Sequence, residues 1–254
     1  MLEVPRLCIA FPKPEYRKAD RKTVDVQRGG SRWQFPRQAT TFITTAPKQI
    51  KYAVIAVPGC DPTSIDYYNG ELRRHITKCG VTASQFDRIA TTAVSSSMTS
   101  PPTEAAITAK LRDAKQNGAN LVVLILPKSD LVIYRDFKNA ADRVIGLQSI
   151  CLVENFKNDI RFRDDLMINV MMKMNLKLGG VNHGLSAVAK WLKNTMVLGG
   201  DLIHPGPGSF AGTPCIASIV GSVDQYGGKC LGSMRLQDVH KTDREVNLNV
   251  PMKE

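Results

Sequence analysis

The chain has 254 residues, of which 43% are hydrophobic, and a formal net charge of +11. This composition supplies enough apolar residues for a substantial buried core, and no apolar run is long enough to cross a membrane. None of the six cysteines forms a CxxC pair, which argues against a zinc site and favours reduced thiols in a cytoplasmic or nuclear protein. The positive charge favours a polyanionic partner.

The first 49 residues are predicted to form a linker segment. Residues 1–51 hold eleven Lys and Arg against four Asp and Glu, and they contain frequent Pro and Gly with few apolar runs. Such a composition is typical of an irregular, exposed segment that does not contribute a core of its own.

From residue 51 onwards, short apolar runs alternate with segments of helical period. The expected strands are residues 51–57, 88–95, 121–127 and 149–153. The expected helices are residues 63–80, 103–118, 130–146 and 163–180, the first capped by Thr63 or Ser64 and the second by Thr103. Alternation of this kind implies right-handed crossovers and parallel pairing. We therefore predict that residues 50–193 form a Rossmann-like, doubly wound parallel α/β domain.

A different pattern follows Lys193. Three strand candidates, residues 195–202, 213–224 and 227–236, are joined by short loops rich in Gly and Pro, with no helix between them. Strands connected in this way pair as an antiparallel meander. Residues 194–254 are therefore predicted to be an incomplete domain, a partial β-meander with a polar tail.

Two pairs of side chains on neighbouring predicted helices could bind an anion. Tyr134 and Lys138 are four residues apart, as are Lys173 and Lys177, so each pair shares a helix face. Lysines near a helix C-terminus are also favoured by the helix dipole alone. Converging on one crevice, however, the three ammonium groups would suit a terminal phosphate, and the Tyr134 ring would suit a nucleobase.

Three stretches, KMNLKLGGVNH, NTMVLGGDLIHP and IASIVGSVD, resemble the Argonaute proteins, and the resemblance extends to YRDFK, LVVLILP and KYAVIAVP. It implies that residues 50–193 are a Mid domain and that residues 194–254 begin an RNase H-like PIWI domain. The implied function is binding of a small single-stranded guide RNA, through its 5′ phosphate and first nucleotide, in RNA silencing (RNA interference).

The resemblance also assigns roles to individual residues. Tyr134 would stack on the first base, while Lys138, Lys173 and Lys177 would hold the 5′ phosphate beside Cys151. Where the family usually has a polar residue, often Gln, before this cysteine, the chain has Ile150, and Ser149 would supply the missing hydrogen bond. The segment that discriminates the first base would comprise Lys128, Ser129, Asp130, Leu131 and Val132.

By the same resemblance, Asp201 is the first catalytic, metal-binding carboxylate of a nuclease. Two-metal catalysis requires several carboxylates around two Mg²⁺ ions. Asp243 and Glu245 lie roughly where the glutamate of the family would come, but the residues around them do not match the family pattern. We expect guide binding to need no cofactor, Mg²⁺ to serve only a full-length nuclease, and residues 1–254 not to cleave RNA.

Two alternatives remain open at this stage. The chain would be part of an active guide-directed RNA endonuclease if it continued beyond residue 254, with other silencing-complex proteins as further partners. Alternatively, it would be a small-molecule-binding α/β domain, because doubly wound sheets also bind such ligands at their strand ends.

Overall fold

The computed structural model describes residues 14–17, 41–61, 63–82, 86–93, 104–154, 160–210 and 212–237. The chain divides into two compact units, Met1–His183 and Gly184–Glu254. Most of the predicted linker, together with Thr103, Asp243 and Glu245, lies outside the described residues. The domain boundaries at residues 49 and 193 stay predictions.

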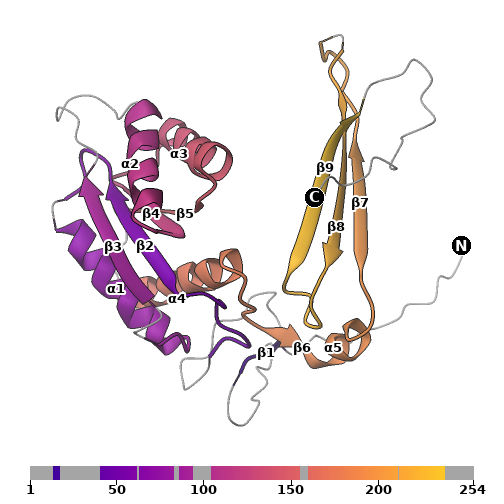
Figure 1. The fold of residues 1–254 in the computed structure, drawn as a ribbon, viewed down its shortest axis with the longest axis horizontal. Coiled ribbons are helices and arrows are strands. Elements are labelled where there is room, and N and C mark those ends of the chain that lie inside the picture. Colours follow the sequence, from indigo (N-terminus) through magenta and orange to yellow (C-terminus); the bar gives the residue numbers. More distant parts are fainter. Residues whose placement is uncertain are drawn as a thin grey trace, which may run out of the picture. The chain divides into compact units, whose positions relative to one another are not determined.

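A four-stranded parallel sheet forms the centre of the first unit, as predicted (Figure 1). Its strands, in the spatial order β3-β2-β4-β5, are Phe86–Ala93, Ile50–Ala56, Leu121–Leu126 and Gln148–Val153. All six residues of β4 are buried, because helices cover both faces of the sheet. Strand β5 is an edge strand, so one of its sides is open to groups from the helices on either face.

Five helical segments cover this sheet (Figure 1). They are α1 (Ser64–Lys78), α2 (Glu104–Gln116), α3 (Leu131–Lys138), η2 (Asn139–Ile145) and α4 (Ile160–Lys177). The apolar side chains of α1 and α4 pack on one face of the sheet, and those of α2, α3 and η2 pack on the other. The predicted doubly wound arrangement is therefore confirmed.

The third helix differs from its prediction as one continuous helix over residues 130–146. It is α-helical only to Lys138 and continues as a π-helix through η2, where Ala140, Ala141 and Ile145 are buried. Gly146 then ends it in the left-handed conformation, at a φ of 69°, which glycine adopts at little cost. Helical periodicity in a sequence does not distinguish these two hydrogen-bond patterns over so short a segment.

The predicted capping of α1 by Thr63 is wrong in detail. Thr63 occupies the N-cap position, but its side chain makes no capping hydrogen bond. Instead, the Thr63 backbone N–H and hydroxyl donate to Asp61 Oδ1 at 2.8 and 2.7 Å. Asp61 thus closes a local turn before the helix.

Polar side chains join α4 to α1 at the surface. Arg74 donates to Asp164 Oδ1 at 2.8 Å, and the ring Nε2 of the buried His75 lies 3.0 Å from the same oxygen. The hydrogen bond from Arg74, and to a smaller extent that from His75, lowers the pKa of the Asp164 carboxyl to about 2. These contacts fix the rotation of α4 about its own axis, and hence the direction of its lysines.

A buried amide closes the C-terminal end of α4. The Asn175 side chain is 0% exposed, and its Nδ2 donates to Thr44 O and to Asn182 Oδ1, both at 3.0 Å. The backbone N–H of Gly180 donates to Asn175 O at 2.7 Å. A Cβ atom at Gly180 would fall within the van der Waals radius of the Asn175 amide, so this approach requires glycine.

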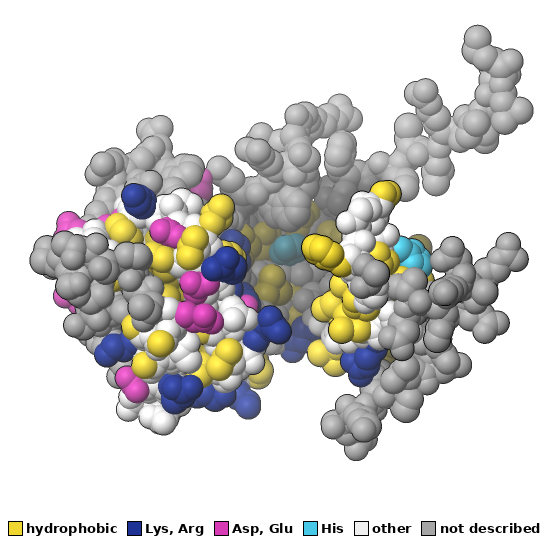
Figure 2. Space-filling model, turned by 90° about the horizontal axis from the view of Figure 1, so that it is seen from above, with side chains coloured by type: hydrophobic (Ala, Val, Ile, Leu, Met, Phe, Trp, Pro, Cys, Tyr) yellow, Lys and Arg dark blue, Asp and Glu magenta, His cyan; other side chains and the backbone are white. Residues whose placement is uncertain are grey.

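The second unit contains the predicted antiparallel meander, in the order β7-β8-β9. Its strands are Leu198–Ile203, Cys215–Ser222 and Cys230–Gln237, preceded by β6 (Gly184–Leu185) and by α5 (Ser186–Leu192), which was not predicted. Many apolar side chains of this sheet are exposed, as Figure 2 shows in yellow; they include Leu198, Ile203, Leu231 and Leu236. Among the described helices, none has the length and apolarity needed to cross a bilayer.

Replacing Gly180 by Ala should destabilise the first unit by about 2 kcal/mol, because the added methyl group must displace a buried, hydrogen-bonded amide. Gly70→Ala is the matched control, since a Cβ at Gly70 meets open space. This helix-favouring change should be neutral or stabilise by up to about 1 kcal/mol. Urea unfolding followed by circular dichroism measures both variants, and equal midpoints would contradict the prediction.

Candidate nucleic-acid interface

The half-buried Lys138 side chain is the centre of the candidate site. It extends from the last residue of α3, and its Nζ donates to the backbone O and to the side-chain Oγ of Ser149, both at 2.7 Å. Burial lowers the pKa of Lys138, because removing water disfavours the charged ammonium. The fold therefore places a partly desolvated cation at the open edge of the sheet.

Lys173 and Lys177 of α4 influence the Lys138 ammonium. Both side chains are exposed, and both lie close enough to Lys138 for their positive charges to lower its pKa further, Lys177 more than Lys173. Because α3 and α4 cover opposite faces of the sheet, the charges of Lys173 and Lys177 act on Lys138 from the other side of the edge strand β5. The predicted convergence of three ammonium groups is thus consistent with the geometry.

Tyr134 lies one turn before Lys138 on α3, with 44% of its surface exposed. The Lys138 Nζ is 5.9 Å from the centroid of the Tyr134 ring, within the range of a cation–π contact. The start of this helix is fixed by Asp130, whose side chain accepts hydrogen bonds from Val132 N and Ile133 N at 2.9 and 3.0 Å. An aromatic ring is therefore held next to the cations and open to solvent.

Only part of the predicted base-discriminating segment is a loop. Lys128 and Ser129 precede the helix and are exposed, and Asp130 is its N-cap. Leu131 and Val132 belong to the first turn of α3, with 81% and 57% of their surfaces exposed. Apolar side chains this exposed at a helix start are available for contact with a planar ligand.

Strand β5 presents alternate residues to the two faces of the sheet. Ile150 is 5% exposed and packs in the cluster formed with α1 and α4, which explains why no polar side chain occupies this position. Ser149, 0% exposed, points to the other face, towards Lys138. The Cys151 thiol also packs on that face, and burial raises its pKa to about 11, so it is neutral at physiological pH.

Asp142 was missed by the sequence analysis. Its carboxylate Oδ1 accepts a hydrogen bond from Ser149 Oγ at 3.0 Å, and its negative charge raises the pKa of Lys138, against the effect of burial. The signal that could have identified it is its spacing of four residues from Lys138, which places opposite charges on one helix face.

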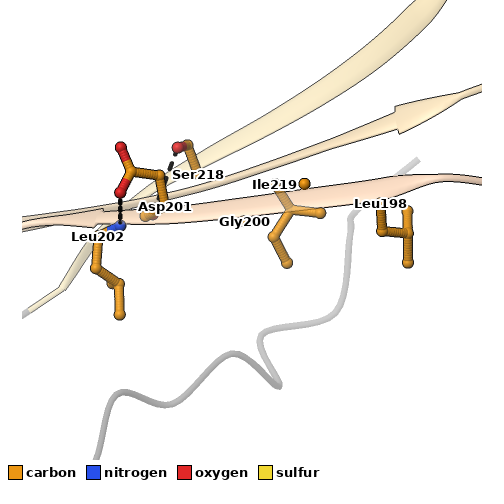
Figure 3. A pocket seen from close by; sticks show the side chains of 7 residues that line it. Leu198, Gly200, Asp201, Leu202, Ser218 and Ile219 are labelled. Atoms are coloured by element: carbon orange, nitrogen blue, oxygen red, sulfur yellow. Dashed lines mark hydrogen bonds between the residues drawn. The ribbon is translucent and has the colours of Figure 1, made fainter. Parts of the chain in front are cut away.

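Asp201 lies in the exposed strand β7, away from these groups in the sequence and in the second unit. Its Oδ1 accepts a hydrogen bond from Leu202 N at 2.9 Å, and Ser218, opposite it on β8, lies on the same side of the sheet. Leu198, Leu202 and Ile219 point to the opposite face of the sheet, where they line a pocket (Figure 3). The Asp201 carboxylate therefore lies beside the Ser218 hydroxyl, on the face away from these apolar side chains.

Among the described residues, Asp201 belongs to no group of three or more Asp, Glu, His or Cys side chains that could share a metal ion. This donor set does not fit a two-Mg²⁺ centre. Glu71, His75 and Asp164 do gather within such a distance. Arg74, however, already bridges both of these carboxylates at 2.8 Å, so its guanidinium supplies the neutralising charge there.

Comparison with known proteins identifies a matching family model and solved structures of similar fold. The Piwi domain family model matches residues 121–253. The fold is similar to the MID-PIWI domains of N. crassa QDE-2 (TM-score 0.62, 24% identity, covering 77% of this chain and 54% of that chain). It is equally similar to the C-terminal lobe of a budding yeast Argonaute (TM-score 0.62, 23% identity, covering 89% and 48%).

A third similar structure is that of Kluyveromyces polysporus Argonaute with a guide RNA (TM-score 0.62, 22% identity, covering 89% of this chain and 28% of that chain). The chain thus spans about half, or less, of the length of the solved relatives that it matches. At these identities the solved structures support the fold, and the family assignment rests on the sequence match. Because the Piwi model matches more than half of its residues, this chain belongs to the Argonaute family.

Proposed function

We propose that the first unit binds the 5′-phosphorylated end of a small single-stranded guide RNA in RNA silencing, with no cofactor required for binding. The observation that supports the proposal is the Lys138 ammonium, bound to Ser149 at the edge strand β5 with the charges of Lys173 and Lys177 near enough to lower its pKa. A 5′ phosphate carries a charge of about −1.5 to −2 at neutral pH. It would relieve the mutual repulsion of these three cations.

Desolvation makes this site suited to an anion. An ammonium group that has lost part of its water gains more from a charged partner than one in bulk solvent, because the effective dielectric constant is lower. The Lys138 ammonium is in this state. Charge-assisted hydrogen bonds to a phosphate are also roughly twice as strong as those between neutral groups.

Tyr134 supports recognition of a nucleotide and not of a bare anion. Its exposed ring lies beside the Lys138 ammonium. Bases of single-stranded nucleic acids stack on aromatic side chains without strict sequence preference. The first base would therefore lie on Tyr134, near the exposed Leu131 and Val132.

The relatives support the same ligand class. The Kluyveromyces polysporus Argonaute of similar fold was solved with a guide RNA, and its shared fold motivates transfer of that ligand to this chain. The geometry around Asp201 does not favour the nuclease alternative for these 254 residues. No described feature favours a neutral small molecule over a nucleotide.

The first prediction from this proposal concerns the 5′ phosphate. A 5′-phosphorylated RNA should bind at least about tenfold more tightly than the same RNA with a 5′ hydroxyl, because the latter lacks the charge-assisted hydrogen bonds. Lys138→Ala and Lys177→Ala should each reduce this ratio. Fluorescence anisotropy with labelled RNAs at fixed salt measures it.

Lys190→Ala is the matched control, because it removes one exposed positive charge from the second unit. It should leave the phosphate ratio unchanged. Equal affinities of the wild-type chain for the two RNAs would refute the proposal and indicate non-specific backbone binding. In a parallel thermal-shift experiment, uridine and adenosine monophosphates should stabilise the chain more than the nucleosides or neutral sugars do.

A second prediction concerns Tyr134. Tyr134→Ala should weaken binding of both RNAs by about 1–3 kcal/mol, because it removes the stacking surface. Tyr134→Phe should retain most of the affinity, since it keeps the ring. Loss of affinity in Tyr134→Phe as large as that in Tyr134→Ala would show that the hydroxyl, and not the ring, makes the contact.

A third prediction concerns Asp201. Asp201→Ala should leave both the phosphate ratio and the total RNA affinity unchanged, because the proposed site lies in the other unit. The purified chain should show no Mg²⁺-dependent cleavage of a guide-paired target, since one exposed carboxylate cannot replace the water of two Mg²⁺ ions. Cleavage by the wild-type chain that disappears in Asp201→Ala would contradict this expectation.

A further inference from the structure

Three groups form a continuous hydrogen-bonded chain behind the proposed phosphate site. Asp142 Oδ1 accepts from Ser149 Oγ at 3.0 Å, and Ser149 Oγ accepts from Lys138 Nζ at 2.7 Å. The backbone O of Ser149 accepts a second bond from the same ammonium, also at 2.7 Å. The order is therefore carboxylate, hydroxyl, ammonium.

The middle group has a single hydroxyl hydrogen, and this fact gives the chain its direction. Because Ser149 Oγ donates that hydrogen to Asp142, its lone pairs are turned towards Lys138. Ser149 is 0% exposed, and its hydroxyl is engaged on both sides. Its geometry therefore suits contact with Lys138 better than the direct phosphate contact expected from the resemblance.

The ends of the chain lie in different surroundings. Asp142 is exposed on η2, so its carboxylate keeps much of its water and stays charged at little cost. Lys138 is half buried. The buried residues Ala140, Ala141 and Ile145 fix η2 against the sheet, which holds the carboxylate within reach of Ser149.

We propose that Ser149 and Asp142 are positioning residues, which hold the Lys138 ammonium where it contacts the 5′ phosphate and oppose its repulsion by the neighbouring lysines. This inference rests on the proposed function of the site and assigns two residues a role in it. The ammonium has three N–H donors, of which Ser149 engages two. The third is directed to a ligand instead of sampling several rotamers.

The charges around Lys138 support this role. Its pKa is lowered by burial and by Lys177 and Lys173, and is raised by the negative charge of Asp142. Removal of the Asp142 charge should therefore lower the Lys138 pKa further. The ammonium, and with it the advantage of the phosphorylated RNA, would then be lost at a lower pH on the alkaline side.

The test measures the phosphate ratio, which is the affinity for 5′-phosphorylated RNA divided by that for 5′-hydroxyl RNA. The ratio is measured between about pH 6.5 and pH 10.5, so that the pH at which the ammonium is lost can be compared between variants. In Asp142→Asn the alkaline fall of the ratio should move down by about half a pH unit, a modest shift because this carboxylate is exposed. In Ser149→Ala the ratio at pH 7 should fall by about three- to tenfold. The affinity for 5′-hydroxyl RNA should stay unchanged in both.

Asp136→Asn is the matched control, because it removes one carboxylate charge from the same helical segment. Asp136 is paired with Arg135 at 2.9 Å, so the ratio and its pH profile should be unchanged. In the double variant Lys138→Ala/Asp142→Asn, the second change should have no further effect. An additional loss in that background would overturn the inference, because Asp142 would then act independently of Lys138.

The two levels of the proposal fail differently. If the wild-type phosphate ratio is one, both the proposed function and this inference are wrong. If the ratio is large and depends on Lys138, but Asp142→Asn leaves its pH profile unmoved and Ser149→Ala leaves its size unmoved, only the positioning role is refuted. Since Asp142→Asn conserves shape at an exposed position, it tests the inference even if Ser149→Ala does not fold.

Discussion

The partly desolvated ammonium of Lys138 is the constraint on which the candidate site depends. A cation that loses water is stable only where acceptors replace that water, and Ser149 supplies two of them. The addition of Lys173 and Lys177 nearby makes the cluster unfavourable in the absence of an anion. The backbones of α3 and α4, from which these lysines extend, are held in place by the apolar core. The packing of the helices on the sheet therefore keeps the three lysines in one region of the fold.

The edge position of β5 explains how cations from opposite faces can meet. Strand β4 is buried on both faces and has a strand on each side, so side chains from α3 and α4 cannot reach one another across it. Among the described strands, none lies beyond β5, and the Lys138 ammonium reaches Ser149 of this strand from α3. The contacts of Arg74 and His75 with Asp164 and the Asn175 amide then set the rotation and the end of α4. In this way, residues outside the candidate site determine where the lysines of α4 lie.

The sequence predicted the parallel sheet because its strands and helices have strong, distinct periods, and β4 is apolar throughout. It predicted the meander because three apolar runs follow one another without a helix. The spacing of Tyr134 with Lys138, and of Lys173 with Lys177, was visible as well. The π-helical turn of η2 was not visible, because it depends on how Ala140 and Ala141 pack against the sheet. The spacing of Asp142 from Lys138 was visible in the sequence, but its hydrogen bond with the buried Ser149 was not, because that contact joins an exposed residue of η2 to a strand.

Asp201 and Lys138 illustrate why a motif residue alone does not make a site. Both are charged residues in motifs shared with Argonautes, but the groups that surround them differ. Lys138 receives a hydroxyl, a carbonyl, an aromatic ring and two further charges from three separate elements. Asp201 lies on a sheet whose neighbouring side chains are apolar or hydroxylic, and its carboxylate is engaged by the adjacent backbone N–H of Leu202. A carboxylate becomes a metal ligand when other donors share its ion, and among the described residues Asp201 belongs to no group of three or more such donors. Among the described residues, charged and polar side chains from separate elements therefore come together around Lys138, where helices meet the edge of the sheet.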